Sequence, residues 1–385
     1  MAADDALRTG AALALVAVAG ALAAAVLWRL AGSVMPRKRW MRPNYRGEQI
    51  VATSGLLVVA VGAAAAVALT VLVSASCEGA GWFAYAAVSD TAAVSVSDAG
   101  RSASSTVPEF DTDPVELAVA GAVATVIALV GFGALGYRDD TRGDARVGGI
   151  AAHFRRSWHE RRLTTGTQKA LGGGAAALLC TQIALWGNPI ALWDQCASRA
   201  GVGFGFLRSL LSVVTGAVDG WSPVALVRAA LIVALSANVL NLLDRVPGRA
   251  TKAALAWWLC GLVPVALADA AWQQGFHYAG ADWAWLAWQS PALWAAGAVG
   301  ASVGLLRSEM REQHMQGDTG VNATGAALGL ATVAMASGTV EWVMLAVLVA
   351  LNLASERWSF SAAIDAVAPL RWLDRLGSPY RRPGS

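Results

Sequence analysis

Residues 51–75 read VATSGLLVVAVGAAAAVALTVLVSA, a run without a single charged side chain. A helix rises about 1.5 Å per residue, so this run is long enough to cross the roughly 30 Å hydrocarbon core of a bilayer. The whole chain of 385 residues agrees: it is 56% hydrophobic and 14% charged, with a mean hydropathy of +0.50. Soluble domains carry roughly 25% charged residues. We therefore predict an all-α, polytopic transmembrane helical bundle with about nine or ten spans.

The charges on either side of this run alternate in sign. The segment before it, 35–50, is rich in Arg and Lys, whereas the segment after it, 76–113, is mostly acidic. Because cytoplasmic loops are enriched in Lys and Arg, the basic segments are expected inside and the N-terminus outside. The segments predicted to be cytoplasmic are 35–50, 138–168, 244–252, 307–322 and the basic tail, 355–385.

The remaining apolar runs divide the chain into one bundle and its connections. We expect a transmembrane bundle over 1–354, a polar outer loop at 76–113 and an outer insertion at 188–221. The apolar, glycine-broken stretch 200–217 inside that insertion is either a short extra helix or a re-entrant piece. The predicted spans are 10–34, 51–75, 115–137, 169–187, 222–243, 253–272, 284–306, 323–338 and 340–354.

Two adjacent carboxylates, Asp139 and Asp140, follow the third predicted span. Neighbouring carboxylates repel each other and are favoured where a cation such as Mg²⁺, which prefers oxygen ligands, neutralises them. A solvated helix end at the membrane surface is the alternative. Lys169, at the start of the next span, is either a headgroup anchor or a point charge for a phosphate.

Amides and an acid repeat at helical spacing where the fifth span ends. Asn238, Asn241 and Asp244 lie three residues apart in turn, which puts them along one face of a helix. Such a face is expensive against lipid and is expected to point into the bundle or a cavity. We favour a binding site, and hydrogen bonds between helices are the alternative.

The fourth polar segment precedes the eighth span. Asp318 lies in the sequence GDTG at 317–320, where glycines allow close backbone approach and a helix N-terminus favours an anion. An ordinary helix cap is the alternative. Arg307, Arg311 and His314 lie nearby, either as basic partners for phosphates or as ordinary surface charges. All four segments fall on the predicted cytoplasmic side, and together they suit phosphoryl chemistry with a divalent metal.

The order of these segments resembles the polyprenyl-phosphate N-acetylhexosamine-1-phosphate transferases, the superfamily of phospho-MurNAc-pentapeptide translocase and the GlcNAc-1-phosphate transferases. The resemblance runs from about residue 36 to about residue 354. It rests on DD at 139–140, threonine and lysine before a span at 164–169, N-x-x-N-L-x-D at 238–244 and GDTG at 317–320. The segment PNYRG at 43–47, followed by SGL at 54–56, resembles the family's first cytoplasmic loop.

The resemblance implies an activity: transfer of a sugar-1-phosphate from a nucleotide-sugar to a polyprenyl phosphate in cell-envelope glycan synthesis. It implies Mg²⁺ held by Asp318 with Asp139 and Asp140, the latter two also acting on the lipid phosphate. Lys169 would contact phosphate. The implied partners are the membrane, the lipid phosphate and the nucleotide-sugar, with no nucleic acid and with a homo-oligomer left open. The implied location is the plasma membrane, with the active face cytoplasmic.

The chain departs from the family in the part that would bind the nucleotide-sugar. Asn238, Asn241 and Asp244 would line that end, with Arg307 and Arg311 as further contacts. Pro247 stands where the family has a second acid near the uracil, and residues 352–360 replace its His-rich loop. We therefore expect an altered donor site. The alternative is a non-catalytic relative that binds polyprenyl phosphate or a lipid-linked sugar as a partner of envelope machinery.

Overall fold

The structure is a computed structural model of the chain. It describes residues 2–31, 35, 38–44, 46–79, 114–142, 157, 159, 164–186, 223–272, 291–336 and 338–380. Most of the predicted outer loop and the predicted outer insertion lie outside these ranges.

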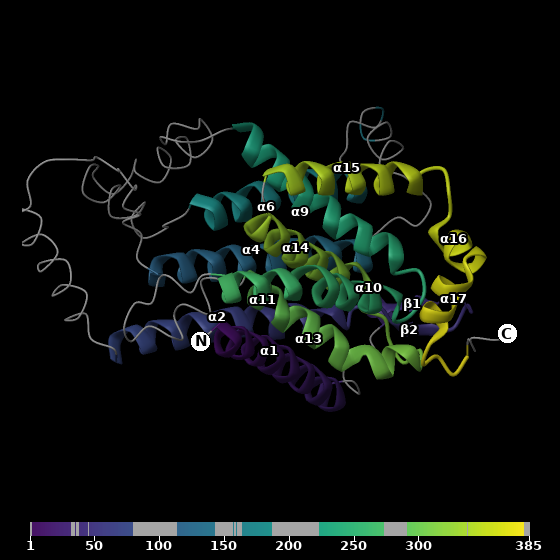
Figure 1. Cartoon of the computed structure of the whole chain (residues 1–385). Helices are drawn as coiled ribbons and strands as arrows, with labels where there is room; N and C mark the ends of the chain where they lie inside the picture. Colours follow the sequence, from purple (N-terminus) through teal and green to yellow (C-terminus); the bar gives the residue numbers. More distant parts are fainter. Residues whose placement is uncertain are drawn as a thin grey trace, which may run out of the picture.

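Most of the described chain folds into long helices that lie beside one another in one bundle (Figure 1). Six of them are long and apolar enough to cross a membrane within these ranges. The prediction of an all-α membrane bundle is confirmed at this level, and the count of nine or ten spans stays a prediction. The helices of the bundle are α1 (Ala2–Ala31), α2 (Gly55–Gly79), α4 (Pro114–Arg142), α6 (Thr165–Trp186), α9 (Pro223–Leu243), α10 (Arg249–Trp257), α11 (Val263–Trp272), α13 (Pro291–Met310), α14 (Gly317–Met335) and α15 (Gly338–Ser355). A π-helical turn over Trp258–Leu262 joins α10 to α11.

Helix α14 is the centre of the bundle. It packs against α2, α4, α9 and α13, and almost every residue from Gly317 to Val333 is buried. Helix α15, by contrast, exposes large apolar side chains such as Val343, Val347 and Leu353. A helix that is buried on all sides is a core helix, and one with an exposed apolar face is suited to lipid contact.

Small residues allow the helices to approach each other closely. A Cβ atom at Gly300 or Gly304 of α13 would collide with the backbone of Ala17 or Ala21 of α1. A Cβ atom at Gly136 of α4 would collide with the backbone of α14 at Asp318. Close packing of this kind is the usual source of association between helices in a membrane. At Gly136 it also fixes how near α4 comes to the first turn of α14.

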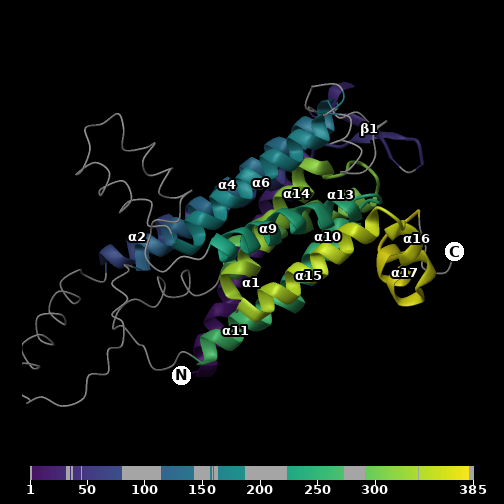
Figure 2. The same ribbon diagram turned by 90° about the horizontal axis from the view of Figure 1, so that it is seen from above.

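Two features at one end of the bundle were not predicted. The predicted cytoplasmic loop 35–50 contains an antiparallel hairpin of β1 (Met41–Pro43) and β2 (Gln49–Val51), preceded by a 3₁₀ turn over Lys38–Trp40. The predicted basic tail contains two short helices, α16 (Phe360–Ala366) and α17 (Ala368–Arg375). Figure 2 shows β1, α16 and α17 at the same end of the bundle, with α16 and α17 following the end of α15.

The helix boundaries refine the predicted spans where the polar segments lie. Helix α4 continues to Arg142, five residues beyond the predicted end at 137, so both adjacent acids lie in its last turns. Helix α14 begins at Gly317 instead of 323, which places Asp318 in its first turn. Both helices therefore extend beyond their apolar runs into polar residues, at the end of the bundle where the polar segments meet.

Candidate functional site

The start of α14 lies among carboxylates from other segments. The first N–H groups of a helix have no partner inside the helix, and the residue before α14, Gln316, supplies no side-chain cap. Asp140 of α4 fills this role: its Oδ1 accepts from the Asp318 N–H at 3.0 Å and its Oδ2 from the Thr319 N–H at 2.9 Å. Thr319 Oγ1 also donates to Asp140 Oδ2, at 2.6 Å.

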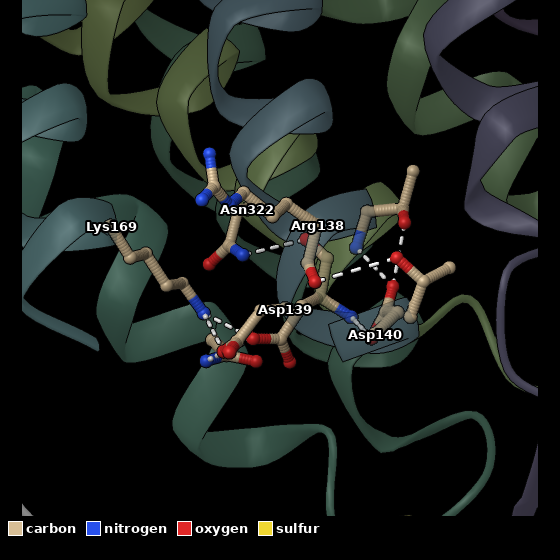
Figure 3. A network of polar contacts seen from close by, with 9 residues as sticks. Arg138, Asp139, Asp140, Lys169 and Asn322 are labelled. Atoms are coloured by element: carbon tan, nitrogen blue, oxygen red, sulfur yellow. Dashed lines mark hydrogen bonds and ion pairs between the residues drawn. The ribbon is translucent and has the colours of Figure 1, made fainter. Parts of the chain in front are cut away.

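The carboxyl group of Asp140, from a distant segment, therefore lies at the positive end of α14. This leaves the carboxylate of Asp318, in the first turn, turned toward Lys169 of α6. Lys169 Nζ forms an ion pair with Asp318 and lies 3.6 Å from Asp139 Oδ2. Figure 3 shows the Lys169 side chain reaching toward Asp139, while Asp140 lies further along the same helix. The adjacent acids thus have different partners: Asp139 pairs with Lys169, and Asp140 holds α14.

Two asparagines complete the surroundings of Asp318. In the amide orientation that satisfies both of its partners, Asn241 donates to Asp318 Oδ1 at 2.7 Å and accepts from Lys169 Nζ at 3.0 Å. Asn322, one turn further along α14, donates to the backbone oxygen of Asp318 at 2.6 Å (Figure 3). We name the group formed by Asp139, Asp140, Lys169, Asn241, Asp244 and Asp318 the acidic cluster.

Asp244 is the least satisfied carboxylate of the acidic cluster. Its Oδ1 atom is buried and has no hydrogen-bond partner among the described residues. Burial, and then the neighbouring charges of Glu309, Asp318 and Asp140, raise the pKa of Asp244 well above its usual range. An orphaned carboxylate oxygen beside other acids is the environment in which a cation is most stabilising.

The structure separates some residues that the sequence placed together. Asn238 donates to Asn352 Oδ1 of α15 at 2.5 Å, so it makes a hydrogen bond between two helices. Arg307 and Arg311 are exposed at the end of α13 and just after it, and they take no part in the contacts described above. The three polar residues of the N-x-x-N-L-x-D motif are therefore divided: Asn241 and Asp244 belong to the acidic cluster, and Asn238 lies outside it.

His314 was expected to act as a basic partner for phosphate, and this expectation is wrong. The ring is fully buried, against Trp28, with Nδ1 2.8 Å from Ser54 Oγ and Nε2 2.8 Å from Ser308 Oγ. Burial lowers the pKa of His314 to about 3, so the ring is neutral at pH 7. Its function in the fold is to tie the segment before α2 to the loop between α13 and α14.

A second buried network, beside the acidic cluster, was not predicted. Glu309 is fully buried and its Oε2 accepts from Thr251 Oγ1 at 2.9 Å. Gln316 donates to the same Thr251 Oγ1 at 2.6 Å and accepts from Ser302 Oγ at 3.1 Å. The sequence did hint at this network, because Glu309 is an acid at the end of an apolar span. Burying such an acid is costly unless it faces other polar groups. This network fixes the residue before α14 and so the position of Asp318.

The oxygen ligands and the charge of the acidic cluster fit a divalent cation. Lys169 pairs with both Asp318 and Asp139, so these two carboxylates share one ammonium, and Asp244 lies close enough to Asp318 to feel its charge. Within the described ranges, no group of three or more His, Cys, Asp or Glu side chains is already arranged as a metal site. Because Asp140 is occupied by the N-terminus of α14, the carboxylates suited to a metal are Asp139, Asp244 and Asp318.

The double role of Asp140 gives a stability prediction. We expect Asp140→Asn to lower the free energy of unfolding by about 1–3 kcal/mol. The amide NH₂ would replace one carboxylate oxygen and face the N–H groups of Asp318 and Thr319, which are also donors. Asp139→Asn is the matched control and should cost less, since the ion pair between Asp139 and Lys169 is partly exposed. Thermal unfolding of both variants in detergent measures the difference. Equal losses would contradict the assignment of Asp140 as the cap of α14.

The buried ring of His314 gives a pH prediction. An unfolded histidine takes a proton near pH 6.5, whereas the folded ring does so only near pH 3. Stability from this group is therefore complete above pH 6.5 and is lost as the pH falls toward 3, by at most about 1.4 kcal/mol per pH unit. The melting-temperature difference between the wild type and His314→Asn should shrink from pH 7.5 to pH 5. A constant difference would contradict a neutral ring.

Comparison with known proteins adds no relative to this picture. No protein-family model matches the chain, and no curated protein matches it. The acidic cluster, and the order of the sequence motifs that form it, are therefore the features that bear on function.

Proposed function

We propose that the protein transfers a sugar-1-phosphate from a nucleotide-sugar to a polyprenyl phosphate at the cytoplasmic face of the plasma membrane. The observation that carries the proposal is the convergence of Asp139, Lys169, Asn241 and Asp318 from four separate helices. These are the four segments whose order resembles the transferase family. A bundle without chemistry would gain little from gathering carboxylates that repel each other at one end.

In this reaction an oxygen of the lipid phosphate attacks the β-phosphorus of the nucleotide-sugar. The bond between the β-phosphorus and the bridging oxygen breaks, and a nucleoside monophosphate leaves with that oxygen. Phosphoryl transfer asks the protein mainly for positioning and for stabilisation of charge. Lys169 provides a point charge for a phosphate oxygen. Asn241 hydrogen-bonds to both Lys169 and Asp318 and so fixes their relative positions.

The proposal includes Mg²⁺, with Asp318 and Asp139 as the residues that would hold it and Asp244 beside them. When bound, Mg²⁺ neutralises the diphosphate and polarises its phosphorus–oxygen bonds. Asp140 acts through the fold, because it sets the first turn of α14 from which Asp318 projects. The basic segments at this end of the bundle support a cytoplasmic position for the acidic cluster in the plasma membrane. The proposed topology has nine or ten spans and an outer N-terminus.

The donor end is the part of the proposal that differs from the family. The turn at Pro247 is buried, and Arg249, two residues after it, is bound to Asp374 of α17 at 2.8 and 3.0 Å. An arginine and a docked helix thus stand next to the place where the family has a second acid. This supports a donor that differs from the family's usual one.

The same observation favours the second candidate, a non-catalytic relative that binds polyprenyl phosphate or a lipid-linked sugar. To separate the two, purified protein in detergent would receive Mg²⁺, polyprenyl phosphate and a panel of nucleotide-sugars. Release of a nucleoside monophosphate with at least one donor is expected. Binding of the lipid phosphate without release for any donor would refute the transferase and leave the binding protein.

A further inference from the structure

The C-terminal helices are attached to the bundle by their polar side. Both partners of the ion pair between Arg249 of α10 and Asp374 of α17 are buried, and Arg249 Nη1 also donates to Ser361 Oγ at 2.7 Å. Lys252 Nζ donates to the backbone oxygens of Leu373, Asp374 and Leu376 at 2.7–3.1 Å, where α17 ends. A lysine at a helix C-terminus satisfies carbonyls that have no partner in the helix.

The apolar side of the same segment points away from the bundle. Trp372 and Leu373 of α17 are each 51% exposed, and Val367, Leu370 and Leu376 are similarly exposed. A helix on a water-facing surface has the opposite arrangement, with apolar residues against the core and polar residues outside. An exposed apolar stripe of this kind needs something to cover it.

The position of the segment indicates what covers it. It follows directly from α15, whose exposed Val343, Val347 and Leu353 make one of the apolar faces suited to lipid. Trp358, between α15 and α16, is 69% exposed and continues this apolar surface to α17. Figure 1 shows α16 and α17 lying across the end of the bundle instead of continuing along it. A helix that lies across the end of the spans, beside a lipid-facing helix, is placed to lie in the membrane interface.

We propose that α16 and α17 form an interfacial membrane-binding segment, with Val367, Leu370, Leu373 and Leu376 in the boundary between lipid headgroups and acyl chains. The rings of Trp358, Trp372 and Tyr380 lie at headgroup level, where aromatic side chains with a polar tip are favoured. The partner is the lipid surface itself. The predicted basic tail is thus part of the membrane-embedded protein, and its attachment to Arg249 holds the turn after Asp244 at the depth of the interface. This inference does not depend on the transferase reaction.

Spin labels attached to single cysteines in lipid nanodiscs test the proposal. Leu370→Cys and Leu373→Cys, each with the four native cysteines replaced, carry the label on the apolar side of α17. Gln313→Cys, exposed in the loop between α13 and α14, is the matched control. Size-exclusion profile and melting temperature establish that each variant is folded. Collision rates are measured with oxygen, which partitions into lipid, and with a water-soluble nickel chelate.

Labels at 370 and 373 should collide several-fold more with oxygen than with the nickel chelate, and the order should reverse at 313. Nickel accessibility at 370 and 373 equal to that at 313 would overturn the proposal. Loss of access to both reagents, with dipolar broadening between labels, would also overturn it, because a second copy of the chain would then cover this face.

Discussion

Replacing Asp318 with asparagine is expected to lower the rate of sugar-1-phosphate transfer by about 10³-fold, since several kcal/mol of electrostatic stabilisation would be lost. The substitution keeps the size of the side chain and removes its charge. Asp318 is the carboxylate that both Lys169 and Asn241 contact, so the change affects the centre of the acidic cluster. The measurement is the initial rate of nucleoside monophosphate release with saturating donor and Mg²⁺.

The matched control for this variant is Glu48→Gln. Glu48 is an exposed carboxylate between β1 and β2, at the same end of the bundle, and its ion pair with Arg46 is solvent-exposed. It should retain the wild-type rate, because exposed ion pairs of this kind contribute little. A fully active Asp318→Asn variant would refute the assignment of Asp318 as a metal ligand.

Lys169→Met is expected to reduce transfer by about 10²-fold, the usual effect of removing one charged donor from a transition state. Without the ammonium, Asp139 and Asp318 face each other with no lysine between them, and a phosphate loses its point charge. Methionine keeps most of the length of the side chain. Steady-state kinetics with varied lipid phosphate measure the effect on kcat and on KM.

Lys169→Arg distinguishes charge from geometry. It keeps the positive charge but replaces a compact ammonium with a planar fork, so it should recover part of the activity. If Lys169→Met were as active as the wild type, the ion pair would hold helices together without taking part in phosphate binding. If Lys169→Arg were no better than Lys169→Met, the geometry at this position would matter more than the charge.

The sequence predicted the members of the acidic cluster better than their roles. Asp139, Lys169, Asn241 and Asp318 were all expected at span ends on one side, and the structure brings them into contact. Their division of labour depends on tertiary geometry. Adjacent residues on a helix point in directions about 100° apart, so Asp139 and Asp140 meet different neighbours. Only the position of α14 decides that Asp140 caps it.

The misplaced residues have physical reasons of the same kind. His314 looked like a surface base because it follows two arginines, but the segment before α2 covers it and removes its water. Asn238 lies one turn from Asn241, yet α15 reaches it first. Asn322 could have been found from the sequence, since it lies four residues after Asp318 on the same helix face.

Hydrophobic runs predicted the bundle, because length and apolar composition alone are enough to identify a helix that can cross a membrane. They did not predict which helix is central. Helix α14 is less apolar in sequence than α2 and α9, and it is central because Gly136 of α4 and Gly325 and Gly329 facing α9 allow close packing. The C-terminal helices were missed because their apolar stretches are short and are interrupted by charged residues. The partner of Asp374 is Arg249, more than a hundred residues earlier.

The most direct measurement of the proposed function is detection of the lipid product. Purified protein would be incubated with polyprenyl phosphate, Mg²⁺ and each nucleotide-sugar of the panel, and the lipid extract would be analysed by mass spectrometry. We expect a polyprenyl diphosphosugar with the wild type and Mg²⁺, and none after chelation or with Asp318→Asn. Absence of this lipid for every donor, from folded wild-type protein that binds polyprenyl phosphate, would contradict the proposed function.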